Sequence, residues 1–499
     1  MSEGSRGLAG SACLLYDGIV ARDWRDDRIE ELERENAQLR AQVAELQTVV
    51  EAQRRVIAAL ESRVKDLEAK LGQTSANSSK PPSTDPPGTP PPTRPPPRTG
   101  RKRGGQPGHD KRSRVLVPSE QVDRLHVLKP ETCRRCFKPL VGDDPAPFRH
   151  QVVEIPKPKP FVEEFQLHSL VCENCGTSTQ ATLPAGVPQG NFGPRLQAIA
   201  SVCTGAYNLS KRQTEDLIED VFGIPISLGS VANLEQATSE AIAAPVDEVA
   251  QTIRKAPVVH ADETGWYERS KRAWLWVATT ATLAFFLVRK SRGTEVAMEL
   301  LGKTFAGFLV SDRWSAYSWV DVRRRQVCWA HLLRQFIGFQ THGSEGYAIG
   351  QALELLTETM FHMWHRVRDG TMTRAEFRDR MKTLREFVDA RLREGAACSA
   401  GAVAGRCREI LTLEPALWTF VEVEGIEPTN NAAERGVRPA VLWRKKSFGT
   451  DSPNGSHFVE RILTVVMTLR LQKRNVLDYM TAACEAHLRG EAPPSLLHP

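Results

Sequence analysis

The chain has 499 residues, 41% of them hydrophobic and 25% charged, which is an ordinary globular composition with room for about two to four domains. A net charge of +6 permits a nucleic-acid partner without requiring one, and cysteines spread along so long a chain exclude a small disulfide scaffold. The longest apolar run, residues 273–288, is too short for a membrane span, and no secretion signal is recognisable. We therefore expect a cytoplasmic protein that does not contact a membrane.

Residues 29–71 follow a heptad repeat. The a positions hold Ile29, Asn36, Val43, Val50, Ile57, Val64 and Leu71, and the d positions hold Leu32, Leu39, Leu46, Gln53, Leu60 and Leu67. β-Branched residues at a with Leu at d favour a parallel two-stranded coil, and one Asn at a fixes the register. We predict a dimerisation coiled coil over residues 29–72; the alternative is a helix packed on a globular core. Residues 1–28 stay unassigned.

Residues 73–115 are rich in Pro, Gly and Ser, which predicts an extended linker. Between Arg94 and Arg114 the linker carries eight Lys or Arg residues against one acid, Asp110. Such a basic arm suits the phosphate backbone of DNA, although a linker that only joins two domains would look similar. The candidate DNA-binding residues of this arm are Arg101, Lys102, Arg103, Lys111 and Arg112.

Four cysteines in two close pairs predict a zinc ribbon over residues 116–185. Cys133 and Cys136 form one pair, and after 35 residues Cys172 and Cys175 form the other. Two such knuckles supply four thiolates to one tetrahedral ion and leave no open position, so the zinc would be structural. The gap is longer than in most ribbons, and residues 161–171 look like a strand within it. The alternative is two unrelated pairs of free thiols.

Residues 186–250 have a helical pattern. One helix is expected over Lys211–Phe222, then a turn at residues 223–225, and a second helix capped by Ser227. Helix, short turn and helix is the outline of a DNA-binding helix-turn-helix, but two packed helices without a DNA role look the same.

From residue 256 the pattern changes to strands that deliver two acids. Residues 257–262 form a short apolar strand ending at Asp262, and a strand over residues 305–310 precedes Asp312. A hairpin over residues 273–288 and a helix over residues 294–301 lie between them. In an open mixed sheet, neighbouring strand ends bring two loops to one ligand. We expect both acids at one site.

Two carboxylates brought close repel each other unless they are protonated or bridged by a cation. Oxygen ligands suit Mg²⁺ or Mn²⁺, and two such ions can activate the attacking oxygen and stabilise the leaving one. Glu434 is the best candidate for a third ligand, about one turn into a short helix capped by Thr429 or Asn430. The cationic residues that follow would bind a phosphodiester; they are Arg435, Arg438, Arg444, Lys445 and Lys446.

Three other residues near these acids invite a role. Glu263 follows Asp262 directly, but on a strand it would point to the opposite face, so we interpret it as a bystander. Cys328 and His331 could form half of a metal site, but no second pair is obvious nearby. We therefore predict that these two contribute to packing or hydrogen bonding.

Several motifs together resemble the transposases of the insertion sequence 66 family, over most of the chain from the coiled coil to about residue 485. They are His260-Ala-Asp-Glu-Thr-Gly-Trp266, Ser311-Asp-Arg-Trp-Ser-Ala-Tyr317, Cys328-Trp-Ala-His331, Glu427-Pro-Thr-Asn-Asn-Ala-Ala-Glu-Arg435, Arg444-Lys-Lys-Ser-Phe-Gly449 and Asn77-Ser-Ser-Lys-Pro-Pro82. The resemblance implies a ribonuclease-H-like core whose metal-binding triad is Asp262, Asp312 and Glu434. It also implies a zinc ribbon at the paired cysteines and small accessory proteins from the same mobile element.

The expected architecture is thus a multidomain α/β protein with a ribonuclease-H-like mixed sheet. The core would comprise residues 251–335 and 426–450, interrupted by a helical insertion over residues 336–425 and followed by covering helices in 451–499. We expect a DDE transposase that uses two Mg²⁺ or Mn²⁺ ions and one structural Zn²⁺. Its partners would be double-stranded DNA, at element ends and target, and a second copy of the chain, as a homodimer or higher oligomer.

Two other function classes remain open. A DNA-binding regulator with an inactive core would share the front half of the chain, although the intact acid triad argues against it. A nuclease without strand transfer would use the same metal chemistry, so motifs alone do not separate it from a transposase.

Overall fold

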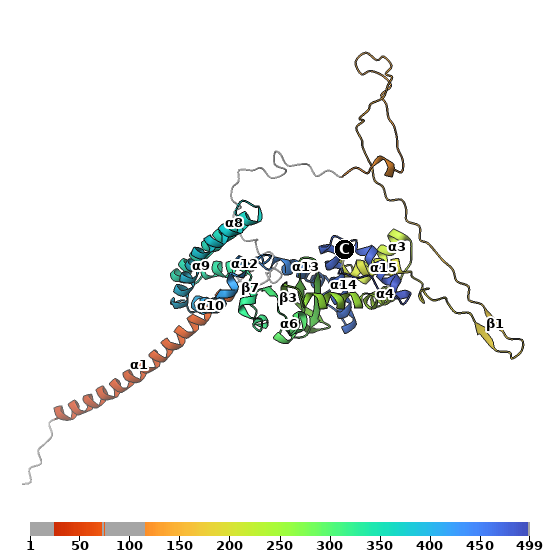
Figure 1. Cartoon of the computed structure of the whole chain (residues 1–499). Helices are drawn as coiled ribbons and strands as arrows, with labels where there is room; N and C mark the ends of the chain where they lie inside the picture. Colours follow the sequence, from red (N-terminus) through yellow and green to blue (C-terminus); the bar gives the residue numbers. More distant parts are fainter. Residues whose placement is uncertain (1–23, 72–73, 75–114, 498–499) are drawn as a thin grey trace, which may run out of the picture. The chain divides into compact units, whose positions relative to one another are not determined.

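The computed structural model describes residues 24–71, 74 and 115–497, and the chain divides into two compact units at Gln73 (Figure 1). Helix α1 (Trp24–Leu71) is the described part of the first unit. Its heptad side chains from Ile29 to Val64 are 45% to 63% exposed wherever an apolar residue occupies an a or d position. The predicted helix is confirmed, and its pairing with a second copy stays a prediction. The unassigned residues 1–23 and the basic arm lie outside the described residues.

The second unit begins with little regular structure. The 3₁₀ turn η2 (Ser119–Gln121) precedes a two-stranded antiparallel sheet of β1 (Ser169–Val171) and β2 (Ser178–Gln180). The predicted strand over residues 161–171 is therefore wrong for all but its last three residues. Only these three have a pairing partner, since β2 is three residues long.

Four helices follow: α2 (Pro194–Gly205), α3 (Lys211–Phe222), α4 (Leu228–Ala241) and α5 (Ala243–Ile253). Gly223 ends α3 in the left-handed conformation at φ 67°, which glycine adopts without steric cost. The Ser227 hydroxyl accepts the backbone N–H of Ser230 and so caps α4 as predicted. Ile218, Ile226 and Val231 form a small core between these helices.

A five-stranded mixed sheet with the order β5-β4-β3-β6-β7 forms the centre of the second unit. Its strands are β3 (Val258–Glu268), β4 (Lys271–Thr279), β5 (Ala284–Arg289), β6 (Phe308–Ser311) and β7 (Arg325–Val327). The first three pair antiparallel, whereas β6 runs parallel to β3 and to β7. The predicted end of the first strand at Asp262 is wrong, because β4 pairs with β3 as far as Glu268.

Short elements connect the strands that carry the acids. Helix α6 (Thr294–Leu301) joins β5 to β6, and the 3₁₀ turns η3 (Ser315–Tyr317) and η4 (Val322–Arg324) join β6 to β7. Large apolar side chains fill the core around the sheet, among them Trp266, Trp276 and Phe286.

The edge strand β5 is covered by α14 (Pro453–Leu471), which is followed by α15 (Val476–Leu488). Three α14 side chains accept the backbone N–H groups that β5 does not pair with a strand. The Thr468 and Thr464 hydroxyls accept those of Ala284 and Phe286, and the Glu460 carboxylate accepts that of Val288. An exposed edge strand is a template for aggregation. Helix α14 covers this edge, and its side chains satisfy these backbone N–H groups of β5.

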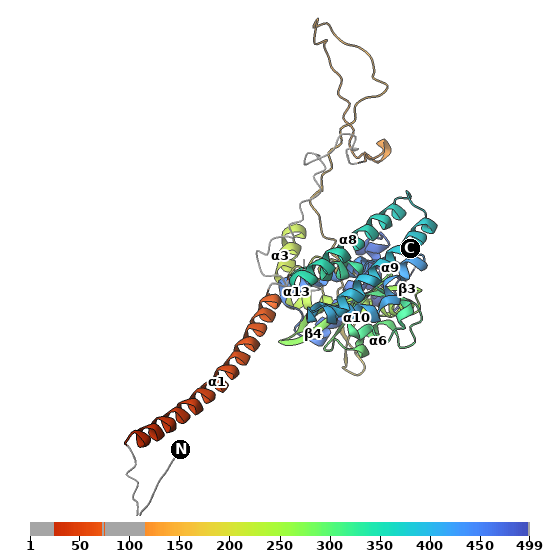
Figure 2. The same cartoon turned by 90° about the vertical axis from the view of Figure 1, so that its left-hand side faces the viewer.

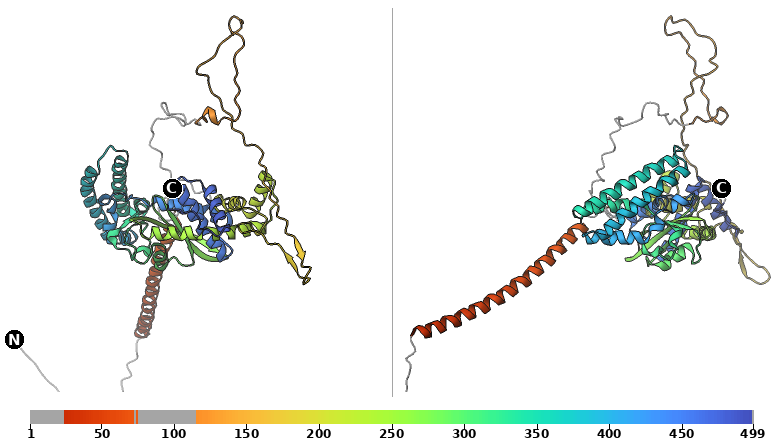
Figure 3. Two further views of the ribbon diagram at one scale, coloured as in Figure 1. Left: turned by 45° about the vertical axis from the view of Figure 1, so that its right-hand side comes forward. Right: turned by 60° about the vertical axis from the view of Figure 1, so that its left-hand side comes forward.

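The predicted helices between His331 and Glu434 are present. They are α7 (Trp329–Phe339), α8 (Gly343–Arg368), α9 (Arg374–Ala397), α10 (Gly401–Thr412), α11 (Glu414–Leu417) and α12 (Thr419–Glu422). Figures 2 and 3 show α8, α9 and α10 side by side. They share a second core, which includes Leu353, Phe377 and Ile410. None of the helices within the described ranges is long and apolar enough to cross a membrane.

Candidate active site

The two aspartates lie at equivalent steps of neighbouring parallel strands. The pairing of β3 with β6 ends at His260 and Val310. Asp262 and Asp312 each come two residues after the end of this pairing. Neighbouring strands are about 4.8 Å apart, and side chains two residues apart share a face of the sheet. Beyond this point β3 continues with β4 alone, so Asp262 borders the opening that β6 leaves. Both aspartates are partly exposed.

Glu434 lies in the first turn of helix α13 (Asn431–Ser447), which packs on β3 and β4. Gly436 allows the close approach, because a Cβ at this position would lie 3.2 Å from Thr279 Cγ2. The helix that we predicted to be short is 17 residues long. Asn430 stands at its N-cap, but its side chain makes no capping hydrogen bond. Instead the buried Asn430 amide donates to the Ala261 carbonyl oxygen at 2.8 Å.

Asp262 interacts electrostatically with each of the other two predicted acids. Removal from water and the negative charges of Glu263, Asp312 and Glu434 raise the pKa of Asp262 well above its ordinary value. Burial also raises the pKa of Asp312, although a hydrogen bond from the Trp314 backbone N–H and nearby arginines oppose this. Such mutual repulsion among carboxylates is relieved when a cation binds between them.

Glu263 points away from Asp262, as predicted. Asp262 pairs with Val277, which contacts α13 on one face of the sheet. Glu263 pairs with Trp276, whose ring packs on Tyr317 on the opposite face. Burial, followed by the charge of Asp312, raises the pKa of Glu263 to about 7. Its carboxylate is nevertheless fully engaged, by Arg292 and by the Tyr317 hydroxyl.

The cationic residues of α13 fall into two groups. Arg435, Arg438 and Lys445 are exposed. Arg444, which we predicted to bind DNA, is partly buried and donates to the Gly265 carbonyl oxygen at 2.5 Å and to the Thr264 hydroxyl at 3.2 Å. Lys446 is exposed and donates to the Asn208 carbonyl oxygen at 3.4 Å.

The end of α13 is docked on the end of β3. Phe448 takes the left-handed conformation, and a Cβ at Gly449 would collide with the Tyr267 carbonyl oxygen. The Thr450 backbone N–H donates to that oxygen at 2.9 Å. Only glycine fits this close approach, and the contact fixes α13 at the end opposite Asn430.

Cys328 and His331 come together with Glu434, which the sequence did not predict. One ligand atom from each lies within 4.8 Å of the others, an arrangement that could hold a metal ion. Within the described residues no further group of three such side chains lies this close, so the structure does not bring the predicted acids Asp262, Asp312 and Glu434 to within this distance of one another. The His331 Nδ1 atom is 3.7 Å from Glu434 Oε1. Burial, together with the charges of Arg334 and Arg313, lowers the pKa of His331 to about 3, so its imidazole is neutral.

The paired cysteines form two separate knuckles. The Cys133 N–H donates to the Lys138 carbonyl oxygen and the Cys172 N–H to that of Thr177, both at 2.9 Å. Each pair therefore lies in a tight turn, as predicted, but the two pairs are not brought within ligand distance of each other. Between residues 115 and 197 no described residue is buried.

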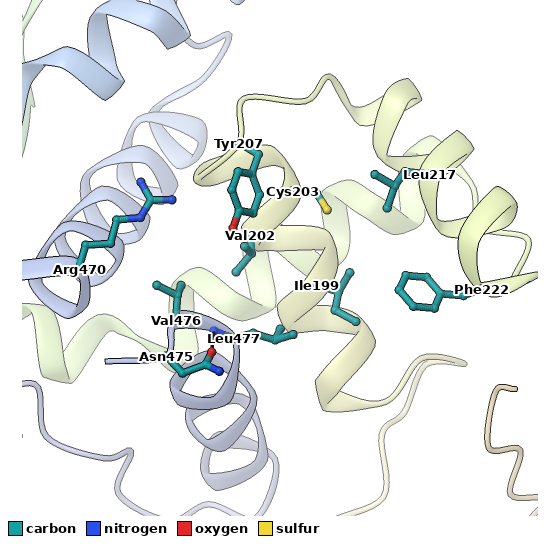
Figure 4. A pocket seen from close by; sticks show the side chains of 10 residues that line it. All are labelled: Ile199, Val202, Cys203, Tyr207, Leu217, Phe222, Arg470, Asn475, Val476 and Leu477. Carbon is teal, nitrogen blue, oxygen red and sulfur yellow. Dashed lines mark hydrogen bonds between the residues drawn. The ribbon is translucent and has the colours of Figure 1, made fainter. Parts of the chain in front are cut away.

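A cavity of about 340 Å³ lies between α2, α3 and the start of α15 (Figure 4). It is lined mainly by apolar side chains: Ile199, Val202, Cys203, Tyr207, Leu217, Phe222, Arg470, Asn475, Val476 and Leu477. None of these is an acid, so this cavity is not part of the carboxylate site.

Comparison with known proteins gives one family match that contains all three acids. Residues 189–457, more than half of the chain, match the family model described as the IS66 transposase family. The chain belongs to the IS66 transposase family. The matched range contains the three acids, Cys328 and His331, and excludes the paired cysteines. IS66 membership supports a transposase role in general, and with it a DNA substrate and the use of divalent metal.

Two further similarities extend beyond the transposase match. Residues 22–115 match a family of unknown function (DUF6444). An uncharacterised protein of Sinorhizobium fredii (strain NBRC 101917 / NGR234), y4qI, is 25% identical over 422 residues, covering 76% of this chain and 75% of that protein.

Sequence reasoning missed the residues that support the acids: Asn430, Arg292, Tyr317 and Trp314. Two of them, Trp314 and Tyr317, lie in the motif around Asp312, and Asn430 lies in the motif around Glu434. Their presence in these motifs was the available signal. Arg292 lies outside every motif, and its place beside Glu263 follows only from the fold.

Proposed function

We propose that this IS66-family protein cuts the ends of its mobile DNA element and joins the freed 3′-hydroxyls to target DNA. Water first breaks the bond between phosphorus and the 3′ oxygen, which leaves a 3′-hydroxyl on the element and a 5′-phosphate on the flanking DNA. That 3′-hydroxyl then attacks a phosphodiester of the target and displaces the target's 3′ oxygen, which leaves as a hydroxyl. We assign Asp262, Asp312 and Glu434 as the residues that hold divalent metal. The observation that carries this assignment is geometric: Asp262 and Asp312 each stand two residues past the last β3–β6 pair, and α13, which carries Glu434, packs on β3.

The strand order also supports a ribonuclease-H-like core. Three antiparallel strands followed by two parallel ones, in the order β5-β4-β3-β6-β7, leave the first acid on the central strand and the second after its parallel neighbour. The third acid then comes from a helix packed on the same sheet.

The residues present fit a divalent ion. Three carboxylates form a hard oxygen donor set. Glu434 Oε1 is a buried atom without a hydrogen-bond partner among the described residues, and its charged neighbours are His331 Nδ1 at 3.7 Å and Arg334 Nη2 at 3.8 Å. When bound, Mg²⁺ or Mn²⁺, two ions in our proposal, would activate the attacking oxygen and stabilise the leaving one. Asp312 is held for this task by the Trp314 N–H, and Glu434 by the docking of α13 at Asn430 and Gly449.

The exposed cations of α13 are suited to bind the DNA backbone beside the acids. Arg435, Arg438 and Lys445 follow Glu434 along one helix and are open to solvent. Arg101, Lys102, Arg103, Lys111 and Arg112 of the basic arm would add contacts that depend on salt. We also propose that α3 and α4 form a helix-turn-helix that contacts the element ends.

We further propose one structural zinc at Cys133, Cys136, Cys172 and Cys175. Each pair already lies in a knuckle. No described residue between 115 and 197 is buried, so this segment has no apolar core of its own among the described residues. Metal binding supplies the folding free energy of small modules of this kind. The zinc ion would bring the two knuckles together.

The decisive experiment for the function uses DNA that carries the native element ends. Full-length protein with Mg²⁺ or Mn²⁺ should release 3′-hydroxyl ends and join them to a target plasmid. Asp312→Asn should abolish both steps while leaving end binding largely intact, because metal ligands act as a unit. Cleavage without joining would instead support a nuclease, and end binding without cleavage a regulator.

A further inference from the structure

A buried network behind the sheet connects the strand of the first aspartate to the loop of the second. Glu263, on the face of β3 opposite Asp262, accepts two hydrogen bonds at its Oε1 atom from Arg292, from Nε at 2.9 Å and from Nη2 at 2.7 Å. Its Oε2 atom accepts the Tyr317 hydroxyl at 2.6 Å. The Glu263 side chain is 1% exposed, and Tyr317 is fully buried. Both carboxylate oxygens are thus occupied by protein donors, which leaves Glu263 no role as a metal ligand.

Arg292 passes this constraint to the loop that carries Asp312. Its guanidinium carbon lies 3.8 Å from the ring centroid of Trp314 and 4.6 Å from that of Trp274. The Trp314 indole N–H donates to the Arg292 carbonyl oxygen at 3.0 Å, so the two residues hold each other through side chain and backbone. The Trp314 backbone N–H, in turn, donates to Asp312 Oδ1 at 2.8 Å.

The loop is therefore held at two points by one carboxylate. Arg292 fixes Trp314, two residues after Asp312, and Tyr317 is bonded to Glu263 directly. Since Glu263 is the residue after Asp262, these bonds link the β3 backbone beside Asp262 to the loop that carries Asp312. Because the Glu263 side chain is buried and both of its carboxylate oxygens accept hydrogen bonds, this link is rigid. An ion pair exposed to solvent would contribute little to holding the loop.

We propose that Glu263 is a positioning residue that sets the spacing of Asp262 and Asp312, and hence the affinity of the site for divalent metal. The proposal rests on the metal site assigned under the proposed function. Arg292 and Tyr317 are the two arms through which Glu263 acts. Residues that orient metal ligands affect metal affinity by about 10- to 100-fold when replaced.

The test measures Mn²⁺ binding to full-length protein by calorimetry, with the thermal midpoint recorded for each variant. Glu263→Gln should weaken Mn²⁺ binding by about 10- to 100-fold. The Mn²⁺ concentration for half-maximal DNA cleavage should rise in parallel, and saturating Mn²⁺ should restore most of the rate. Arg292→Lys should bind Mn²⁺ better than Arg292→Gln, because Lys keeps the charge but loses the two-pronged contact.

Glu460→Gln is the matched control. Glu460 is another buried carboxylate paired with an arginine, Arg289, at 2.6 Å, but it contacts no residue of the Asp312 loop. This control should lower the thermal midpoint and leave the Mn²⁺ affinity unchanged. If Glu263→Gln does not fold, Tyr317→Phe decides, since it removes one hydroxyl and should still weaken binding by about tenfold.

Two results would overturn the proposal, and they differ in scope. If the folded Glu263 or Tyr317 variant binds Mn²⁺ as tightly as wild type, or if Glu460→Gln weakens Mn²⁺ binding equally, Glu263 is only structural. If wild-type protein does not bind Mn²⁺, or if Asp262→Asn binds it unchanged, the proposed metal site itself is wrong and the role of Glu263 falls with it.

Discussion

The side-chain amide of Asn430 donates a hydrogen bond to the carbonyl oxygen of Ala261 at 2.8 Å. Ala261 immediately precedes Asp262, and Asn430 stands at the N-cap of the helix that carries Glu434. One buried bond thus joins the elements that deliver the first and third acids. Together with the contact of Gly449 on Tyr267, it fixes α13 on β3 at both ends. These two contacts give the motifs around Glu434 and Gly449 a physical explanation.

Asn430→Ala should therefore impair cleavage more than it impairs stability. Leaving the buried Ala261 carbonyl oxygen without its partner costs about 1–3 kcal/mol. Release of α13 should also lower cleavage at limiting Mn²⁺ by about tenfold. Asn475→Ala is the control, because Asn475 caps α15 through the N–H groups of Leu477 and Asp478, a contact worth about 1 kcal/mol. Equal losses of activity in both variants would show that Asn430 has no special role.

Asp262→Asn should make the metal-free protein more stable while abolishing cleavage. The pKa of Asp262 is raised in the folded state, so the ionised carboxylate opposes folding. A group of this kind favours the folded state while it is protonated, and that contribution is lost as the pH rises from its ordinary pKa through the raised folded one. The thermal midpoint of Asp262→Asn should thus exceed that of wild type by more at pH 8 than at pH 4. A constant difference across this range would contradict the raised pKa of Asp262.

Zinc should be bound at the paired cysteines in a ratio of one ion per chain. Cys172→Ser should lose this zinc and weaken DNA binding, whereas the sheet and α14 should stay folded because they have their own core. Cys398→Ser, which changes a cysteine on the helical insertion, should keep the zinc. Metal analysis and circular dichroism on the three proteins measure this. Fresh wild-type protein without zinc would contradict the ribbon.

The apolar side chains of α1 should hold two chains together. Replacing Leu39, Leu46 and Leu60 by Gln exposes polar groups where the coil requires leucine, and should convert dimers to monomers in sedimentation at micromolar concentration. Ala41→Gln and Thr48→Gln, at f positions on the opposite side of the helix, should leave the dimer intact. A wild-type monomer under these conditions would show that the heptads pack on something else.

Arg438 and Arg444 should behave differently although both lie in the basic run of α13. Arg438→Ala should reduce affinity for element ends and the salt dependence of binding by about one phosphate contact. Arg444→Ala should lower the thermal midpoint with little change in salt dependence, because this residue is bonded to Gly265 and Thr264. Salt titrations by fluorescence anisotropy would separate the two. Equal slopes for both variants would rule out the distinction.

Periodic segments of the sequence were sufficient to predict most elements. Helix α3, capped by Ser210 and ended by Gly223, has the predicted bounds, and α8, α9 and α10 lie within the helical insertion predicted over residues 336–425. The length of β3 was underestimated, since the residues after Asp262 are polar and only their pairing with β4 makes them a strand. For residues 161–168 a strand was predicted but is absent, because an alternating apolar pattern does not form a strand without a pairing partner.

The acids could be predicted, but the residues that position them could not. Asp262 and Asp312 follow apolar strands, and this local pattern is readable. By contrast, the buried contacts of Glu263 come from Arg292 and Tyr317, which lie on separate segments. Arg444, predicted to bind a phosphodiester, is partly buried beside Gly265, which has no side chain to exclude it. His331 lies beside Glu434 in space although the helical insertion separates the two residues in the sequence. Contacts of this kind depend on the fold, because no sequence spacing encodes them.

The central claim is that Asp262, Asp312 and Glu434 bind divalent metal together. Its most direct test is an anomalous diffraction map of crystals of the protein soaked in Mn²⁺. We expect an anomalous peak within coordination distance of both aspartates and of Glu434, about 2.0–2.3 Å from their oxygens, and its loss in Asp312→Asn crystals. A peak bound by Cys328, His331 and Glu434 alone, with none at the two aspartates, would contradict it.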